Sequence, residues 1–139
     1  MRYATAVEVA APVGVVWRVL EDVEAWPRWT PSMTSVSRTA TGPLTVGETV
    51  RVRQPRLPEA TWTVTAVYPG SAFTWVSRSP GVVTTGTHVV APLPTGSRVT
   101  LGLEQHGPLA GVVGMLLGRT VRRYVDQEAA GLKARVESD

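Results

Sequence analysis

The feature that most constrains the fold is a change of hydrophobic period late in the chain. Between residues 33 and 106, polar and apolar side chains alternate in short runs, which is typical of β-strands. From Leu109 to Val136 the apolar side chains instead form one broad stripe, which predicts a long amphipathic helix. Gly111, Gly114 and Gly118 weaken its first half, so we expect a bend or an irregular start there.

The strand region is divided by short turn sequences such as "YPGSA", "RSPG" and "LPTGS". Connections this short cannot make parallel crossovers, so we expect antiparallel neighbours in a meander. The predicted strands are Tyr3–Val9, Met33–Thr39, Thr49–Gln54, Thr61–Tyr68, Ala72–Ser77, Val82–Val90 and Arg98–His106.

Between the first two strands, Pro12 to Glu21 has helical spacing, and "DVEAWPRWTPS" reads as an irregular turn or a second short helix. The expected fold is α+β, one domain over residues 1–139, with a seven-stranded curved antiparallel sheet around the C-terminal helix. One helix fills such a concavity only with large side chains, and the chain has a single Phe. We therefore expect a cavity for an apolar ligand between sheet and helix.

Composition excludes several classes of protein. Cysteine is absent, which excludes disulfides and thiolate zinc sites and favours a cytoplasmic location. The N-terminus lacks an apolar targeting segment, and Leu109 to Leu117 is too short to span a membrane. The net charge of +3 is small and acidic residues are interspersed, so we expect no nucleic-acid partner. The two histidines are not clustered with carboxylates, so neither metal nor cofactor is expected. The sequence sets no expectation for the oligomeric state.

Several segments together resemble one known superfamily. "VEVAAPVGVVWRVLEDVEAWPRWTPS" is similar to its first strand and two short helices, and "VGETVRV" and "WTVTAVYPGSAFTW" to its middle strands. "GTHVVAPLPTGSRVTLGLEQHGPL" is similar to its last hairpin. By their order, these segments resemble the START-like helix-grip (SRPBCC) superfamily, in particular its bacterial polyketide cyclase/dehydrase and lipid-transport branch.

The resemblance implies a helix-grip fold with a hydrophobic cavity, but it does not imply one activity. Our leading hypothesis is a protein that binds a small aromatic, polyketide-like or lipid molecule. The first alternative is a metal-independent cyclase or dehydratase that uses the same pocket. The second is a co-chaperone-like interaction module, which a filled cavity with an exposed apolar patch would favour.

His88 is the polar residue of greatest interest. It lies in mid-strand, with Gly86 and Val90 on its face, and Gly86 predicts open space beside it. If that face is concave, His88 is a proton shuttle or hydrogen-bonding group in the pocket. Two alternatives stay open: His88 points to solvent while Thr87 points inward, or it is a hydrogen-bonded core residue.

Two residues of the last helix complete the catalytic candidates. Glu128 falls within the apolar stripe, where it is either paired with an arginine or acts as a pocket acid of raised pKa. Tyr124 is expected to bring its hydroxyl into the cavity. Glu104 and His106 share the strand face opposite Leu101 and are expected to point outward.

The ligand-binding prediction rests on which side chains share the concave face. Trp62 and Trp75 lie on one face of their strands and line the cavity if that face is concave, although core packing is the alternative. Trp17, Trp26 and Trp29 are interpreted as packing the short helices, with a place at the cavity mouth as the alternative for the latter two. The predicted ligand-binding residues are Trp62, Phe73, Trp75, His88, Leu101, Val113, Leu117 and Tyr124.

Overall fold

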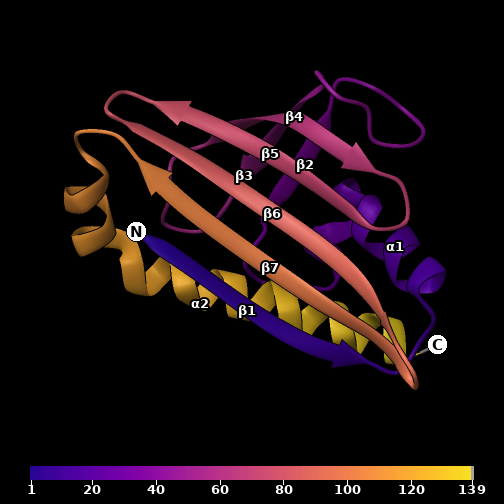
Figure 1. Cartoon of the computed structure of the whole chain (residues 1–139). Helices are drawn as coiled ribbons and strands as arrows, with labels where there is room; N and C mark the ends of the chain where they lie inside the picture. The colour runs from indigo at the N-terminus through magenta and orange to yellow at the C-terminus, as the bar shows by residue number, and fades with distance from the viewer. Residues whose placement is uncertain (139) are drawn as a thin grey trace.

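A computed structural model describes residues 1–138 of the chain. Its elements are β1 (Arg2–Val9), α1 (Val13–Glu21), the 3-10 helix η1 (Val23–Arg28), β2 (Ser35–Arg38), β3 (Thr49–Arg53), β4 (Ala60–Tyr68), β5 (Ala72–Ser79), β6 (Val82–Leu93), β7 (Gly96–His106) and α2 (Ala110–Glu137) (Figure 1).

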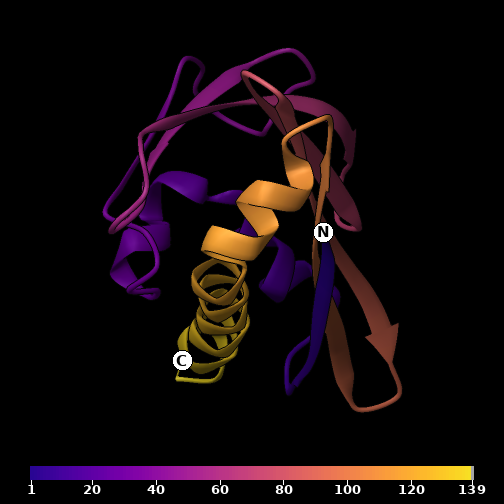
Figure 2. The ribbon, with the colours of Figure 1, turned by 90° about the vertical axis from the view of Figure 1, so that its left-hand side faces the viewer.

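The strands form one antiparallel sheet in the order β1-β7-β6-β5-β4-β3-β2. The sheet curves around α2, while α1 and η1 lie toward the C-terminal half of that helix (Figures 1 and 2). The predicted α+β helix-grip fold is therefore confirmed, and "DVEAWPRWTPS" contains the second short helix. The β6–β7 hairpin extends past the predicted ends, to the pair Leu93 and Gly96.

α2 is held in the sheet by the apolar stripe of its C-terminal half. Ala129, Leu132 and Val136 are almost completely buried in the core. Gly131 lies against Trp29, the residue that follows η1, so closely that a Cβ atom there would be 2.2 Å from the Trp29 backbone oxygen. The first turns of α2 run at an angle to the rest, which Figure 2 shows nearly end-on, as the glycines predicted.

The short helices pack on the sheet through tryptophan, as the packing interpretation predicted. Trp17 and Trp26 are buried, and the Trp26 indole Nε1 donates to the backbone oxygen of Leu20 at 2.9 Å. The Trp26 ring also contacts those of Trp29 and Trp75, with ring centroids 5.6 and 5.5 Å apart. Trp26 and Trp29 are not among the residues that line the cavity, so the alternative at its mouth is wrong.

A buried ion pair fixes the long connection between β2 and β3. The Arg38 guanidinium donates to both carboxylate oxygens of Glu48, at 2.8 and 2.9 Å, and to the backbone oxygens of Gly42 and Pro43. Both charged side chains are almost fully buried. The connection also contacts α1, because the Leu44 backbone N–H donates to the carboxylate of Glu21 at 3.3 Å.

The close contact between Gly131 and Trp29 predicts how substitutions on α2 change stability. Gly131→Ala should lower the free energy of unfolding by about 1–3 kcal/mol, because the new methyl group overlaps the Trp29 carbonyl. Gly111→Ala meets nothing within 4 Å and should raise it by up to about 1 kcal/mol through helix propensity. Urea denaturation of both variants measures the difference. Equal stability of the two would contradict close packing at Gly131.

Candidate functional site

A cavity of about 320 Å³ lies between the concave face of the sheet and α2. Strands β3 to β7 form one wall, and α2 contributes Val113, Leu117, Val121, Tyr124, Val125 and Glu128. Residues of the β3–β4 and β5–β6 connections, such as Pro58 and Pro80, also line the cavity and are themselves exposed. The cavity therefore reaches the surface between these two connections.

Strand register arranges the sheet wall in rows. Phe73, His88 and Leu101 face one another across β5, β6 and β7 in the first row. The second row is Trp75, Gly86 and Leu103, and the third is Trp62, Ser77, Thr84 and Gln105. The cavity wall thus changes from aromatic near the short helices to polar toward the β5–β6 turn.

The aromatic part of the wall is built around Gly86. A Cβ atom at Gly86 would lie 2.7 Å from the indole Nε1 of Trp75, so the ring of the neighbouring strand covers the glycine. The rings of Trp62 and Trp75 lie 5.5 Å apart between centroids. The open space predicted beside Gly86 is therefore wrong, because a cross-strand tryptophan occupies it.

His88 points inward and is both a cavity-lining and a core residue. The residue is 5% exposed, and its ring stacks on Phe73 with centroids 4.0 Å apart. Its Nδ1 lies 3.2 Å from the Phe73 backbone oxygen, which only accepts, so Nδ1 carries the proton and Nε2 is left as an acceptor. Burial lowers the pKa of His88 to about 4, so the imidazole is neutral at pH 7.

Tyr124 does not leave its hydroxyl free in the cavity. The side chain lines the cavity, and its hydroxyl donates to the backbone oxygen of Pro55 in the β3–β4 connection. This hydrogen bond links α2 to the β3–β4 connection on the other side of the cavity. Its ring forms part of the apolar wall.

Glu128 is buried on the cavity side of α2. Burial raises the pKa of its carboxyl to about 8, and a hydrogen bond from Ser32 opposes this only in part. Among residues 1–138 no ion pair joins Glu128 to an arginine, so the paired alternative is wrong, and the alternative of a pocket carboxyl with raised pKa agrees with the structure. The carboxyl is therefore mostly protonated at pH 7 and can donate a hydrogen bond or a proton.

Seven of the eight predicted ligand-binding residues line the cavity, and Phe73 does not, because it is fully buried behind His88. Leu101, Val113 and Leu117 lie on the wall as the stripes predicted. Glu104 and His106 both point outward, as expected, and Glu104 pairs with Arg2 and His106. Within the described part of the chain, no three His, Asp or Glu side chains gather as metal ligands.

Sequence reasoning missed the polar lining of the cavity. Gln54, Ser77, Thr84 and Gln105 all belong to it. Gln105 has the same strand parity as Leu101, which was expected to face inward, so alternation alone identifies its direction. Ser77 and Thr84 become evident only once the register places them beside Gln105.

Comparison with known proteins agrees with this architecture. Residues 1–137 match the family model described as polyketide cyclase/dehydrase and lipid transport. Protein TTHA0849 of Thermus thermophilus is similar over 99% of this chain and 98% of its own, with 19% identity and a TM-score of 0.78. The Zhui aromatase/cyclase of Streptomyces sp. R1128 is similar over 99% and 93%, with 21% identity and a TM-score of 0.78.

A di-domain protein, the ARO/CYC StfQ of the steffimycin biosynthetic pathway, is similar over 99% of this chain and 51% of its own. Its identity is 13% and its TM-score is 0.79. At these identities the likeness shows the shared fold alone. No curated protein matches the sequence.

The packing of His88 predicts the effect of replacing it. His88→Val should lower the free energy of unfolding at pH 7 by about 1–3 kcal/mol, because the stack on Phe73 and the hydrogen bond to its carbonyl are lost. The folded pKa is below 6.5, so wild type loses stability as pH falls from about 6.5 toward 4. The difference in free energy of unfolding between wild type and His88→Val should therefore be smaller at pH 5 than at pH 7. Urea denaturation at both pH values measures it. Unchanged stability at pH 7 would show that the ring is not packed.

The buried acid predicts the opposite pH dependence. The folded pKa of Glu128 is above its unfolded value, so its contribution to stability falls as pH rises from about 4.5 to about 8. Glu128→Gln keeps the shape and removes the titration. The variant should gain stability relative to wild type between pH 5 and pH 8, by up to about 1.4 kcal/mol per unit of pKa shift. A difference that stays constant with pH, measured by urea denaturation, would show that Glu128 is not the titrating group.

Proposed function

Because the chain belongs to the polyketide cyclase/dehydrase and lipid transport family, we propose that it binds one small hydrophobic molecule in the cavity between sheet and α2. The observation that carries the proposal is the cavity itself. Its volume of about 320 Å³ lies at the lower end of the range for pockets of small-molecule ligands. The ligand is aromatic, polyketide-like or a lipid, of the size of a few fused rings.

The aromatic and polar rows favour a ring that carries oxygen at one end. Trp62 and Trp75 offer indole faces for a planar ring. The side-chain oxygen Oε1 of Gln105 is buried without a hydrogen-bond partner, an arrangement that costs free energy in the empty protein. A ligand hydroxyl that donates to this oxygen removes the cost. The same end of the cavity holds Ser77 and Thr84.

Binding of 2-naphthol and naphthalene tests both parts of the proposal. Wild type should bind 2-naphthol about ten times more tightly, the equivalent of one added hydrogen bond. Gln105→Leu should bind both compounds with similar affinity, since only the naphthol hydroxyl uses Gln105. Tryptophan fluorescence titration measures the dissociation constants. If neither compound binds, the ligand proposal fails; if Gln105→Leu keeps the preference, only the assignment of Gln105 fails.

An enzyme that uses the same pocket is the second candidate function, and Glu128 is the observation in its favour. A carboxyl that is protonated near neutral pH on a cavity wall is suited to donate a proton during cyclisation or dehydration. The neutral His88 supplies an acceptor at Nε2. Neither group needs a metal ion to act as acid or base.

Turnover separates the enzyme from the carrier. A model thioester that carries several β-keto groups is incubated with wild type and with Glu128→Gln. Ring closure between an enolisable carbon and a ketone of the same chain releases the ketone oxygen as water, and this loss of water is followed by mass spectrometry. Conversion that falls about 100-fold in the variant, with unchanged naphthol binding, supports the enzyme. Equal conversion by both proteins contradicts the acid assigned to Glu128. The interaction-module hypothesis has less support, because the cavity is not filled by side chains.

A further inference from the structure

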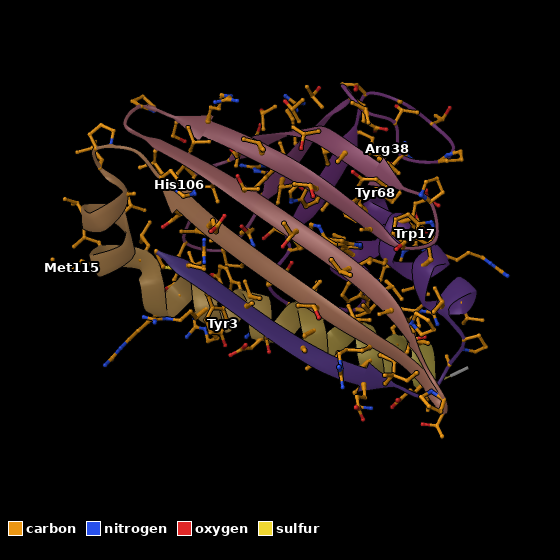
Figure 3. All side chains as sticks on the ribbon, in the orientation of Figure 1. Tyr3, Trp17, Arg38, Tyr68, His106 and Met115 are labelled. Atoms are coloured by element: carbon orange, nitrogen blue, oxygen red, sulfur yellow. The ribbon has the colours of Figure 1, made fainter. Side chains whose placement is uncertain are left out.

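The first turns of α2 are apolar on two opposite sides, although only one side is covered by protein. Val113 and Leu117 face the cavity. On the other side Val112, Met115 and Leu116 are 53%, 84% and 74% exposed. A helix on the surface of a soluble protein normally places charged or polar residues there. In Figure 3, Met115 lies at one end of the molecule, beyond the edge of the sheet.

The exposed side of α2 becomes cationic immediately after these residues. Arg119, Arg122 and Arg123 are exposed and follow Met115 and Leu116 at helical spacing on the same face. The ion pairs found among residues 1–138 do not include these three arginines. Arg122 Nε donates to the backbone oxygen of Gly118 at 3.2 Å, and the Arg123 guanidinium lies 5.7 Å from the centroid of the Tyr124 ring. Neither contact cancels the charge, and both side chains remain exposed.

The nearest acidic side chains have partners of their own. Asp126, one turn further along α2, accepts a hydrogen bond of 2.6 Å from the Tyr3 hydroxyl. Glu104 on β7 is paired with Arg2 and His106. Asp126 keeps its charge when it accepts from a neutral hydroxyl, so it offsets one of the three arginine charges and this face of α2 stays cationic.

We propose that this face, the α2 tip (Leu109, Val112, Met115 and Leu116 with Arg119, Arg122 and Arg123), binds the surface of an anionic lipid bilayer. The apolar side chains enter the headgroup region, and the arginines behind them contact lipid phosphates. Apolar residues followed by cations on one helix face are the pattern of interfacial helices. No helix within residues 1–138 has the length and apolarity needed to cross a bilayer, so the contact is peripheral.

A bilayer fits the α2 tip better than a folded protein does. Met115 and Leu116 are adjacent residues whose side chains protrude into solvent, since no other part of the described chain covers most of their surface. A protein partner needs a groove matched to both side chains, whereas lipid headgroups adapt to them. The same turns line the cavity on their inner side, so the tip lies between the cavity and the proposed bilayer.

Cosedimentation with vesicles tests the α2 tip. Wild type should bind vesicles of phosphatidylcholine with about 30% phosphatidylglycerol, and bind pure phosphatidylcholine at least tenfold more weakly. Met115→Ser combined with Leu116→Ser should reduce binding to the anionic vesicles about tenfold, because insertion is lost. The matched control is Val46→Ser with Val89→Ser, which replaces exposed apolar residues elsewhere and should bind as wild type.

The charges are tested in the same assay. Arg119→Gln with Arg123→Gln should weaken binding to the anionic vesicles at about 150 mM salt. At this salt concentration, attraction beyond about 8 Å is screened, so a loss of binding reports arginines that lie close to lipid phosphates. The matched control, Arg51→Gln with Arg53→Gln on β3, should not weaken binding, because those exposed arginines face Glu59 away from α2. All variants should keep the naphthol affinity of wild type, so a failed ligand proposal leaves this test intact.

Three results would overturn the proposal. The first is no binding to anionic vesicles at low salt. The second is binding that the two serine substitutions leave unchanged, which would mean attraction by charge alone. The third is a dimer, detected by analytical ultracentrifugation, that Met115→Ser with Leu116→Ser abolishes while vesicle binding is absent; the patch then joins two copies of the chain.

Discussion

The position of α2 in the curved sheet depends on the close contact between Gly131 and Trp29, the residue that follows η1. At Gly131 the helix backbone comes so near the Trp29 carbonyl that no side chain fits between them. Leu132 and Val136 then fill the core around this point. The C-terminal half of α2 is thus packed tightly on the core, whereas its first turns run at an angle to the rest of the helix (Figure 2). The cavity lies at that end of α2, and the Tyr124 hydroxyl bridges it to Pro55.

The two buried titratable groups of the cavity oppose each other in their effect on stability. Burial lowers the pKa of His88 and raises that of Glu128, so both are mainly neutral near pH 7. Acid destabilises the protein through His88, whereas base destabilises it through Glu128. A site whose groups carry little charge at neutral pH suits an uncharged ligand, since no buried ion requires compensation. An apolar residue at either position would avoid this dependence of stability on pH.

The order of elements, the antiparallel topology and the inward face of most strands could be predicted from the sequence. These depend on local period and turn composition, which each segment carries by itself. Contacts between distant segments could not be predicted in the same way. Gly86 has no side chain, so the sequence predicted open space beside it. In the structure, the ring of Trp75 from the neighbouring strand covers it, and a single strand gives no sign of that contact. Phe73 had the right parity but lies behind His88. For Glu128 the hydrophobic period allowed either an arginine pair or a raised pKa, and only the three-dimensional burial without an arginine partner decides for the raised pKa.

The unusual composition of the start of α2 follows from this geometry. A helix that closes an apolar cavity needs apolar residues toward that cavity, which accounts for Val113 and Leu117. It does not need them on the outer face, where Met115 and Leu116 expose apolar surface to water instead. Glycines in the same turns reduce helix propensity, so neither packing nor local preference explains this segment. The proposed contact with an anionic bilayer accounts for this outer face. The apolar side chains would lie among the lipid headgroups, and the arginines that follow would attract the negative surface.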